Sequence, residues 1–401
     1  MKAGWRKETL GGIFEIGSSK RVLQKQWQTE GIPFYRAREI VKLAKKGFVE
    51  NDLFISEEHF AELKQKHGVP FAGDLMVSAV GTLGACYVVQ PEDRFYFKDA
   101  SVLRFHPKVE ICSQFFQYAF QWDGLLSAVK KSDGATVGTL TISRAKGISV
   151  PLPPLEEQQR IVAILDEAFE GLERAKANAE ANLASAKELF SAVLTEIFAS
   201  EGPGWSRKTL AELCEKITDG THQTPKYFDE GFIFLSSKNV TSGRIDWENI
   251  RYIDESQHHA MQKRLSPRVG DVLLAKNGTT GVAAMVDRDV PFDIYVSLAL
   301  LRAKTEILPE FLLYFTNSTS AKKQFNKRLK GSGVPNLHLK EIREVEMTFP
   351  RELKEQQRLV RYFEEQRRKT EALIEVAESK LHELDALRQS LLAKAFTGEL
   401  T

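Results

Sequence analysis

The sequence predicts an α+β fold in which two duplicated α/β domains are each followed by a long helix. The two helices are expected to pair as an antiparallel coiled coil, giving the chain an internal pseudo-twofold symmetry. Three observations predict this arrangement. The 401-residue sequence repeats itself after about 200 residues, the last quarter of each repeat has helical apolar spacing, and the rest alternates short β-prone runs with turn residues.

Five matches, in the same order in both halves, establish the repeat. They cover residues 4–10, 73–75, 81–84, 134–140 and 155–162 in the first half, and 204–210, 270–272, 278–281, 331–337 and 353–360 in the second. The clearest match reads LEEQQRIV in the first half and LKEQQRLV in the second. A period near 200 residues is too long for a solenoid, whose repeats run about 20–50 residues. Each repeat therefore contains a whole domain and a long helix.

Residues 155–199 and 352–396 are expected to form the long helices. The first segment contains one glycine and no proline, and the second contains neither. Apolar residues recur at spacings of three and four, with an irregular step after Ala179 and again after Ala377. The helices are expected to pair with each other; the alternative is that each packs on the domain before it. The predicted seam comprises Ile161, Leu165, Leu172, Leu183, Leu359, Phe363, Leu373, Leu381, Leu384 and Leu391.

These helices set the predicted domain boundaries. We expect a first domain at residues 1–153, a first long helix at 154–200, a second domain at 201–350 and a second long helix at 351–401. Neither domain shows the βαβ alternation of a parallel sheet, so a curved or barrel-like sheet is expected. Shorter helices are predicted at 57–66, 112–121 and 309–329, and strands at 77–89 with a break, 95–105, 272–275, 282–286 and 294–301.

Composition limits the class of protein. The chain is 42% hydrophobic and 27% charged, which is typical of a globular protein with proper cores. Its formal net charge of +2 lacks the basic excess that is usual in nucleic-acid-binding domains. The three cysteines have no C-x-x-C spacing, so neither a zinc site nor a disulfide framework is expected. Without a signal-peptide pattern or an 18-residue apolar run, a soluble cytoplasmic protein is expected.

Motifs for catalysis are missing from the sequence. It contains no phosphate-binding G-x-x-x-x-G-K-[ST], no dinucleotide-binding G-x-G-x-x-G, no H-E-x-x-H and no G-x-S-x-G. It also lacks the Asn/Asp-Pro-Pro-aromatic tetrapeptide of an amino-methyltransferase centre. The His258-His259 pair is interpreted as part of a solvated loop rather than as a metal site. We therefore expect no enzyme activity, no cofactor and no metal in this chain.

The domains do contain polar, basic loops with aromatic residues. Arg, Lys, Asn, Thr and similar side chains are those that contact base edges and phosphates. The alternative is that each stretch is simply solvated surface, and the glycines of the repeated G-T-x-G segment could equally be turn glycines. The DNA-binding candidates are Lys20, Arg21, Tyr35, Arg36, Arg38, Lys130 and Lys131 in the first half, and Thr221, His222, Lys238, Asn239, Lys276, Asn277, Lys327 and Arg328 in the second.

The ordered double set of motifs resembles the specificity (S) subunits of Type I restriction-modification systems. The resemblance covers essentially the whole chain. It rests on the G-W-x-x-x-x-L start of each half, the G-D-[LV]-[LM] strand with its G-T-x-G turn, the PLPPLEEQQRIV start of the first long helix, and the loop Asp219-Gly220-Thr221-His222-x-Thr224-Pro225. The second long helix departs from the pattern because Phe349-Pro350-Arg351 replaces the double proline.

The resemblance implies a non-catalytic subunit that binds double-stranded DNA. Each domain would read one half of a bipartite, asymmetric target. The helices would dock two modification (methyltransferase) subunits, which carry S-adenosylmethionine and methylate adenine, and restriction (motor-nuclease) subunits would join them. A different class of function stays open, namely a coiled-coil scaffold that presents two protein-interaction modules and does not bind DNA. Neighbouring genes for an adenine methyltransferase and a helicase-nuclease would favour the restriction-modification interpretation.

Overall fold

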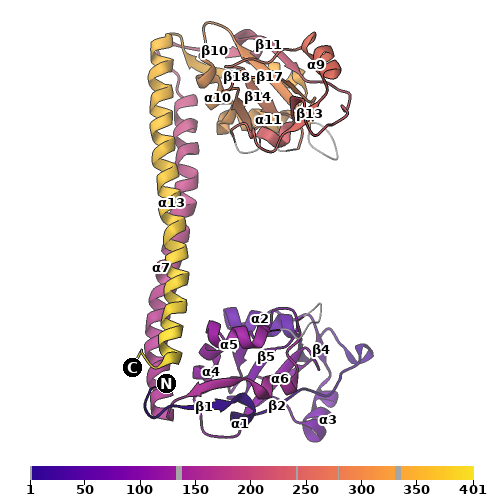
Figure 1. Ribbon diagram of the computed structural model, residues 1–401, viewed down its shortest axis with the longest axis vertical. Coiled ribbons are helices and arrows are strands. Elements are labelled where there is room, and N and C mark those ends of the chain that lie inside the picture. Colours follow the sequence, from indigo (N-terminus) through magenta and orange to yellow (C-terminus); the bar gives the residue numbers. More distant parts are fainter. Residues whose placement is uncertain (1, 132–137, 241–242, 279, 330–335) are drawn as a thin grey trace. The chain divides into compact units, whose positions relative to one another are not determined.

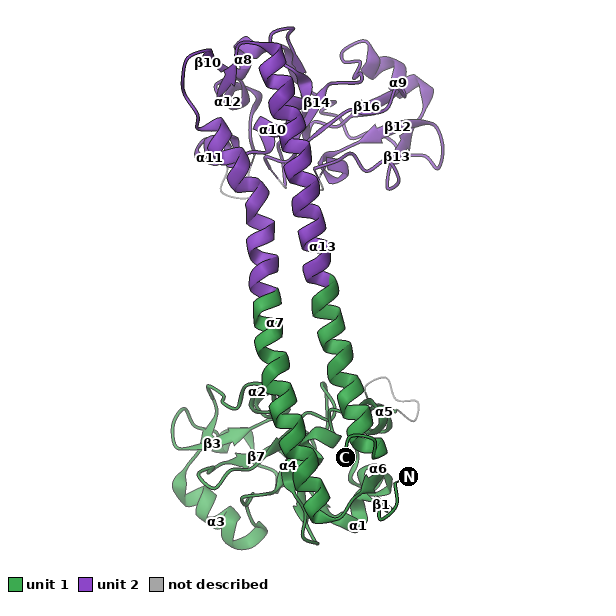
Figure 2. Cartoon of the chain, turned by 90° about the vertical axis from the view of Figure 1, so that its left-hand side faces the viewer, with its two compact units in different colours: residues 1–179, 379–401 green, residues 180–378 purple. Residues whose placement is uncertain are grey.

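The structure, a computed structural model, describes residues 2–131, 138–240, 243–278, 280–329 and 336–401 (Figure 1). The chain forms two compact units (Figure 2). The first unit contains Met1–Ala179 and Ser379–Thr401, and the second contains Glu180–Glu378. The repeat matches at 134 and 137 and at 331 and 334, together with Thr279 of the second G-T-x-G segment, lie outside the described residues.

The described residues of the first unit form three small sheets rather than one barrel. A two-stranded antiparallel ladder joins β1 (Arg6–Thr9) to β9 (Ser149–Leu152). A four-stranded antiparallel sheet has the order β2 (Phe14–Gly17), β8 (Val102–Pro107), β5 (Leu75–Ser78), β6 (Cys86–Val88). A three-stranded sheet has the order β4 (Phe54–Ile55), β3 (Ile32–Tyr35), β7 (Tyr96–Phe97), with β3 and β7 parallel. The helices are α1 (Leu10–Ile13), α2 (Ala37–Lys46), α3 (Glu57–His67), α4 (Ser113–Ala119), α5 (Asp123–Lys130), α6 (Ile142–Gly147) and the 3-10 turn η1 (Gln24–Gln26).

The second unit repeats this topology strand for strand. Its ladder pairs β10 (Trp205–Thr209) with β18 (Glu346–Pro350). Its four-stranded sheet has the order β11 (Cys214–Asp219), β17 (Leu298–Ala303), β14 (Val272–Ala275), β15 (Ala283–Met285). Its third sheet has the order β13 (Arg251–Ile253), β12 (Phe232–Leu235), β16 (Phe292–Ile294), again with one parallel pair. Its helices are α8 (Leu210–Leu213), α9 (Glu255–Gln262), α10 (Pro309–Asn317), α11 (Thr319–Arg328), α12 (Leu339–Arg343) and η2 (Ser237–Val240).

The predicted α+β class is therefore confirmed, with two corrections. The strands form separate sheets instead of the expected curved or barrel-like sheet. The helix predicted over 309–329 is two helices, α10 and α11. Ser318 has extended backbone angles, and its hydroxyl accepts a hydrogen bond from the N–H of Ala321, which starts the second helix. Apolar periodicity alone does not reveal such a break, because both helices bury aromatic residues.

The repeated motifs at the start of each half build the same local structure twice. Gly4 and Gly204 both have a φ of +84°, a left-handed conformation that favours glycine, immediately before β1 and β10. Thr9 and Thr209 then cap α1 and α8 through their side-chain hydroxyls. The glycines of both G-T-x-G segments also have positive φ values, which confirms the interpretation that they are turn glycines.

The repeated E-Q-Q-R segment anchors each long helix to its domain through a buried glutamine. Gln158 accepts a hydrogen bond from the backbone N–H of Cys112 at 2.9 Å and donates one to a carbonyl just before its helix. Gln356 does the same with the N–H of Leu308 at 2.9 Å. Both side chains are buried. The first glutamine of the motif therefore has a structural role in both units.

Replacing Gln356 with leucine is expected to destabilise the second unit. The change removes the partner of the buried Pro350 carbonyl and of the partly buried Leu308 N–H and Glu306 carbonyl. Each unsatisfied buried group costs about 1–3 kcal/mol. The same change at the exposed neighbour Gln357 is the matched control and should leave the urea midpoint of the full chain nearly unchanged. Equal shifts for the two variants would contradict this role of Gln356.

The long helices are α7 (Leu155–Phe198) and α13 (Leu353–Thr397). They lie side by side within the first unit (Figure 2). Arg388 of α13 contacts Glu173 of α7 at 3.3 Å, and Asp385 contacts Lys176 at 3.0 Å. Later residues of α7 therefore contact earlier residues of α13. This order establishes that the two helices are antiparallel in the first unit.

The helices pair in the same way within the second unit. Lys187 of α7 lies 3.9 Å from Glu378 of α13, and the ring centroids of Phe198 and Phe363 are 5.8 Å apart. The order of contacts is again reversed along the two helices. The predicted antiparallel coiled coil is thus confirmed in each unit.

The start of each long helix packs on the domain before it, so the alternative interpretation holds beside the coiled coil. The ring centroid of Phe169 in α7 lies 5.3 Å from that of Tyr118, and that of Phe363 in α13 lies 5.0 Å from that of Tyr314.

The end of each long helix packs on the other domain. Phe396 stacks on Trp122, with centroids 5.4 Å apart, and lies 5.0 Å from Phe115 in the first unit. Phe198 packs against Phe311 and Phe315 at 5.2 and 5.4 Å in the second. The coiled coil therefore completes the hydrophobic core of each domain.

One seam assignment is wrong. Leu373 is 51% exposed, whereas Thr370 and Ala377 are buried. The stripe steps by four from Thr370 to the partly buried Ile374, which turns Leu373 out of the seam by about 100°. The other predicted seam residues are buried or partly buried, namely Ile161, Leu165, Leu172, Leu183, Leu359, Phe363, Leu381, Leu384 and Leu391. Among the residues that the structure describes, no helix combines the length and apolar character needed to cross a bilayer.

Candidate nucleic-acid interface

The candidate residues fall mainly at three equivalent places in the two units. The loop after β2 or β11 holds Lys20 and Arg21, or Thr221 and His222. The loop around the end of β3 or β12 holds Tyr35, Arg36 and Arg38, or Lys238 and Asn239. The end of α5 or α11 holds Lys130 and Lys131, or Lys327 and Arg328. Lys276 and Asn277, at the end of β14, have no polar counterparts in the first unit, where Ala79 and Val80 stand.

The same type of hydrogen bond, from a backbone N–H to a side-chain oxygen three residues later, holds the loop after β3 and the loop after β12. A side-chain oxygen of Glu39 accepts a hydrogen bond from the N–H of Arg36 at 2.9 Å, and one of Asn239 accepts from the N–H of Ser236 at 2.9 Å. The amide group of Asn239 also donates to the carbonyl of Asn249 at 3.1 Å. Asn239 is buried and its amide is used within the protein. It shapes the loop through these hydrogen bonds, and its role as a DNA contact stays a prediction.

Arg36 and Arg38 are both paired with carboxylates. Arg36 contacts Glu39 at 3.2 Å and Asp52 at 2.9 Å, and Arg38 contacts the same two residues. Burial opposes ionisation of Glu39, but the hydrogen bonds from Arg36 and Arg38 outweigh it and lower the pKa of this carboxyl. Two guanidinium groups therefore face two carboxylates. The adjoining Tyr35 is partly buried, with its ring centroid 4.7 Å from that of Phe95.

Other cations of the first unit are available to a ligand. Lys20 and Arg21 are exposed, as are Lys130 and Lys131 at the end of α5. None of the four has a carboxylate within 4.0 Å among the residues that the structure describes. Hydrogen bonds fix the loop that carries Lys20. The Lys20 N–H donates to the Tyr96 hydroxyl at 3.0 Å. These side chains can contact phosphates without breaking an internal ion pair.

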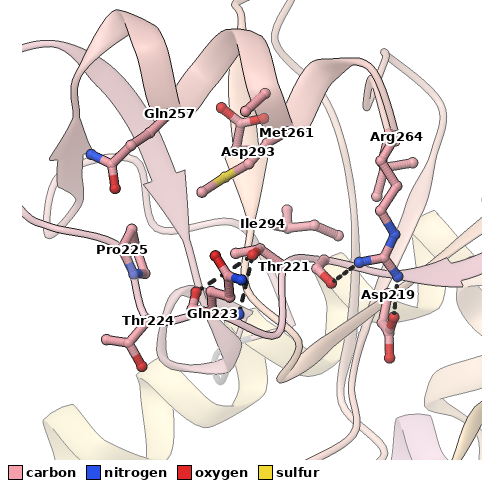
Figure 3. Close-up of a pocket in the computed structure, with 13 residues that line it drawn as sticks. Asp219, Thr221, Gln223, Thr224, Pro225, Gln257, Met261, Arg264, Asp293 and Ile294 are labelled. Atoms are coloured by element: carbon pink, nitrogen blue, oxygen red, sulfur yellow. Dashed lines mark hydrogen bonds and ion pairs between the residues drawn. The ribbon is translucent and has the colours of Figure 1, made fainter.

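In the second unit, the D-G-T-H loop lines a hollow of about 290 Å³ (Figure 3). Asp219 at its edge contacts Arg264 at 2.9 Å, Lys276 at 3.0 Å and His222 at 3.3 Å. Burial opposes ionisation of Asp219, but Lys276 and His222 outweigh it and lower the pKa of this carboxyl. Lys276 is itself buried, at 5% exposure. It therefore acts in a buried ion pair, whereas the sequence suggested a DNA contact.

The glycine of this loop is required by a close approach to β16. A Cβ atom on Gly220 would lie 1.8 Å from the carbonyl oxygen of Ile294. The next residue, Thr221, donates its N–H to that same carbonyl at 3.0 Å. Arg264 closes the other side by donating to the Gly220 carbonyl at 2.9 Å. The D-G-T-H motif thus fixes the path of the loop across the sheet edge.

The first hollow is poorly suited to a phosphate because Asp219 and Asp293 both line it. Asp293 is buried and lies 2.6 Å from His258, whose ring stacks on that of Phe232 with centroids 3.9 Å apart. His258 is therefore a buried residue of α9, and its interpretation as part of a solvated loop is wrong. Its neighbour His259 is exposed. The described residues contain no group of three or more His, Cys, Asp or Glu side chains that could hold a metal ion.

A second hollow of about 250 Å³ has a different character. The lining residues are Tyr227, Phe234, Ser236, Ser237, Lys238, Asn239, Asn249, Arg251, Tyr295 and Ser297, with no carboxylate among them. The guanidinium carbon of Arg251 lies 4.4 Å from the centre of the Tyr227 ring. The hydroxyls of Thr224 and Tyr295, 3.3 Å apart, connect the two hollows. Cations, hydroxyls and aromatic rings without carboxylates favour a ligand rich in hydrogen-bond acceptors.

Sequence reasoning missed Tyr227, Arg251 and Tyr295. Tyr227 stands five residues after His222, the last predicted position of its loop, and its place in a basic, aromatic stretch is a usable signal. Arg251 has no such signal. The antiparallel register of β12 and β13, which pairs Phe234 with Arg251, brings it to the hollow. Tyr295 arrives through the parallel pairing of β12 with β16.

The remaining candidates of the second unit lie away from this hollow. Arg328 donates to the carbonyl of Gln324 at 3.2 Å and to that of Glu344 at 3.4 Å, which fixes the end of α11. Lys327 beside it is exposed. Asn277 forms an isolated bridge with Asn336. Lys330 of the same basic run lies outside the described residues.

Comparison with known proteins confirms the resemblance. A family model described as Type I restriction modification DNA specificity domain matches residues 2–182 and 203–381. The specificity subunit of the Type I restriction enzyme EcoKI of Escherichia coli K12 is 27% identical over 288 residues, which are 67% of this chain and 61% of that protein. A putative Type I specificity subunit of Haemophilus influenzae is 34% identical over 164 residues, 41% of this chain and 40% of that protein. The chain thus spans less than two thirds of either relative.

Solved structures share the fold. A chain from a structure of Type I restriction-modification complex assembly is 21% identical, with a TM-score of 0.81 and coverage of 100% of this chain and 99% of that one. The HsdS subunit from Thermoanaerobacter tengcongensis is 21% identical, with a TM-score of 0.63 and coverage of 100% and 98%. Since the family model matches most of both halves, the chain belongs to the Type I restriction-modification DNA specificity family.

Proposed function

We propose that this chain is the non-catalytic DNA-recognition subunit of a Type I restriction-modification enzyme. In this proposal, residues 1–153 and 201–350 are two recognition domains, and each reads one half of a bipartite DNA target. The observation that carries the proposal is the duplication of the fold with divergent side chains at equivalent places. A duplicated fold provides two DNA-binding domains. Because their side chains differ, the two domains would bind different half-sites, which makes the target asymmetric.

The two units differ in side chains at one equivalent loop. The loop after the third strand carries Arg36 and Arg38 in the first domain and Ser236 and Lys238 in the second, on the same helix-capping scaffold. A cation is kept at the second of these positions, whereas a hydroxyl replaces a guanidinium at the first. Phosphate contacts position a protein on DNA, and base contacts specify the sequence. The exchanged side chain fits a difference in the base that each domain reads.

The long helices at 154–200 and 351–401 are proposed to dock two modification subunits, which would hold S-adenosylmethionine, and restriction subunits would join that complex. The surface of α13 supports docking. Leu373 is 51% and Val376 is 65% exposed, and Tyr362 is 39% exposed. Large apolar side chains grouped on an exposed helix face mark protein–protein contact sites. The exposure that removes Leu373 from the seam makes it available to such a partner.

Selection from a random duplex library tests the DNA-binding part of the proposal. The full chain, purified with its proposed modification subunits, should enrich two short sequences separated by unspecified bases. Lys130→Ala should weaken binding to all sequences and reduce the slope of log affinity against log salt by about one, because one phosphate contact is lost. Lys66→Ala, at an exposed lysine on α3, should change neither. A wild-type complex that enriches no sequence would refute the proposal.

A further inference from the structure

Arg251 has an unusual environment for an exposed arginine. It is the first residue of β13, and strand pairing sets it opposite Phe234. Its guanidinium lies over the ring of Tyr227 at 4.4 Å from the guanidinium carbon to the ring centre. Its side chain forms no hydrogen bond or ion pair with any residue that the structure describes. The aromatic face therefore orients the guanidinium while its N–H donors stay open.

The other arginines near the D-G-T-H loop do not share this property. Arg264 donates to Asp219 and to the Gly220 carbonyl, and Arg268 is paired with Glu215 at 2.8 Å. Those donors are already used within the protein. Because no carboxylate lines the hollow around Arg251, nothing there repels a ligand that offers hydrogen-bond acceptors.

The first unit lacks this cation at the equivalent place. Register places Leu53 where Arg251 stands, since Phe34 donates its N–H to the Leu53 carbonyl at 2.9 Å. Trp27 takes the place of Tyr227, with its ring 6.3 Å from that of Phe34. Leu53 is buried in an apolar cluster with Phe34. At this position of the fold, the first unit therefore has a buried apolar side chain, whereas the second unit has an exposed guanidinium.

We infer that Arg251 is a specificity-determining residue that reads a guanine in the half-site bound by the second domain. This inference rests on the proposed function. A guanidinium donates two parallel hydrogen bonds to O6 and N7 of guanine in the major groove, which is the commonest specific contact between proteins and DNA. Such a contact requires a flat donor pair with a fixed orientation, and the Tyr227 ring supplies that orientation. A lysine at the end of a helix, such as Lys327, has a flexible point charge that suits phosphate instead.

Arg251→Lys separates base reading from phosphate binding, because it keeps the charge and removes the planar donor pair. The full chain with its modification subunits is used in the duplex selection, with wild type, Arg251→Lys and Arg251→Ala in parallel. Both variants should weaken the preference for guanine at one position of one half-site, and Arg251→Ala, which keeps no donor, should abolish it. Affinity for the wild-type target should fall by roughly 5- to 150-fold, the range of one bidentate base contact. Preferences at the other half-site should be unchanged, which also reports that the variants are folded.

Arg288→Ala is the matched control. Arg288 is also an exposed arginine of the second unit that lies over an aromatic ring, that of Trp247 at 5.5 Å, but it does not line the hollow. It should retain every base preference. If Arg251→Ala keeps all base preferences, or if both Arg251 variants weaken binding equally to every sequence, the residue contacts phosphate or nothing and the inference fails while the proposed function stands. If the wild type enriches no sequence at all, the proposed function itself fails.

Discussion

Exchanging residues 206–348 for the corresponding segment of a relative should replace one half of the methylated target and leave the other half unchanged. The cut points are favourable because they lie in one ladder: Arg207 pairs with Thr348 and Ser206 with Phe349 across β10 and β18. The two ends of the exchanged segment therefore lie next to each other in the fold. It carries both hollows and the end of α11, and it leaves the long helices in place.

Mapping of N6-methyladenine in cells that express the exchanged chain with its modification subunits measures this result. The reciprocal exchange of residues 6–150, whose ends likewise lie on the β1–β9 ladder, is the control and should change only the other half. A change in both halves after either exchange would show that the two domains do not read independently.

Phe363→Ala should unfold the second unit at much lower denaturant concentration. Phe363 is fully buried and lies 5.8 Å from Phe198 of α7 and 5.0 Å from Tyr314 of α10, measured between ring centroids. Removing such a ring from a core costs about 3–5 kcal/mol through lost burial and the cavity left behind. The cost should fall on the second unit, because both partners belong to it.

Hydrogen exchange of the full chain at increasing urea concentration measures this effect unit by unit. Peptides from β14 and β17 should lose protection early in Phe363→Ala, whereas peptides from β5 and β8 of the first unit should not. The adjacent Tyr362, which is 39% exposed, supplies the control, and its alanine variant should shift protection by about 0.5 kcal/mol or less. Similar behaviour of the two variants would mean that the coiled coil does not complete the core of the domain.

Local and repeated features were predictable from the sequence. The duplication, the long helices to within about two residues at each end, and the helix at 57–66 all follow from periodicity, glycine and proline. These signals depend on neighbours in the chain. The break at Ser318 escaped because one capping hydroxyl decides it, and two amphipathic helices in a row have the same pattern as one.

Features set by distant residues were not predictable. The sequence shows Arg36 and Arg38 as a basic run, but Asp52 reaches them through the fold. Lys276 looked available and is buried against Asp219. Conversely, Arg251 stands alone in the sequence, and its value as a candidate comes from the register of β12 and β13. Charge runs report composition along the chain, whereas a binding surface depends on which charges remain unpaired after folding.

The net charge of +2 likewise does not show which charges are unpaired after folding. Several cations that the sequence offered are matched by carboxylates, while exposed lysines at the ends of α5 and α11 have no carboxylate partner among the residues that the structure describes. A nearly neutral chain can therefore carry local surfaces that attract DNA phosphates. The charge of each local surface is the relevant quantity, and the net charge of the chain does not report it.

Genome-wide mapping of N6-methyladenine tests the central claim most directly. The wild-type chain is expressed with its proposed modification subunits in a host that lacks other adenine methyltransferases. We expect methylation at one motif made of two different specified segments separated by a spacer of fixed length and free sequence. A single continuous motif, two identical halves, or no chain-dependent methylation would contradict the account.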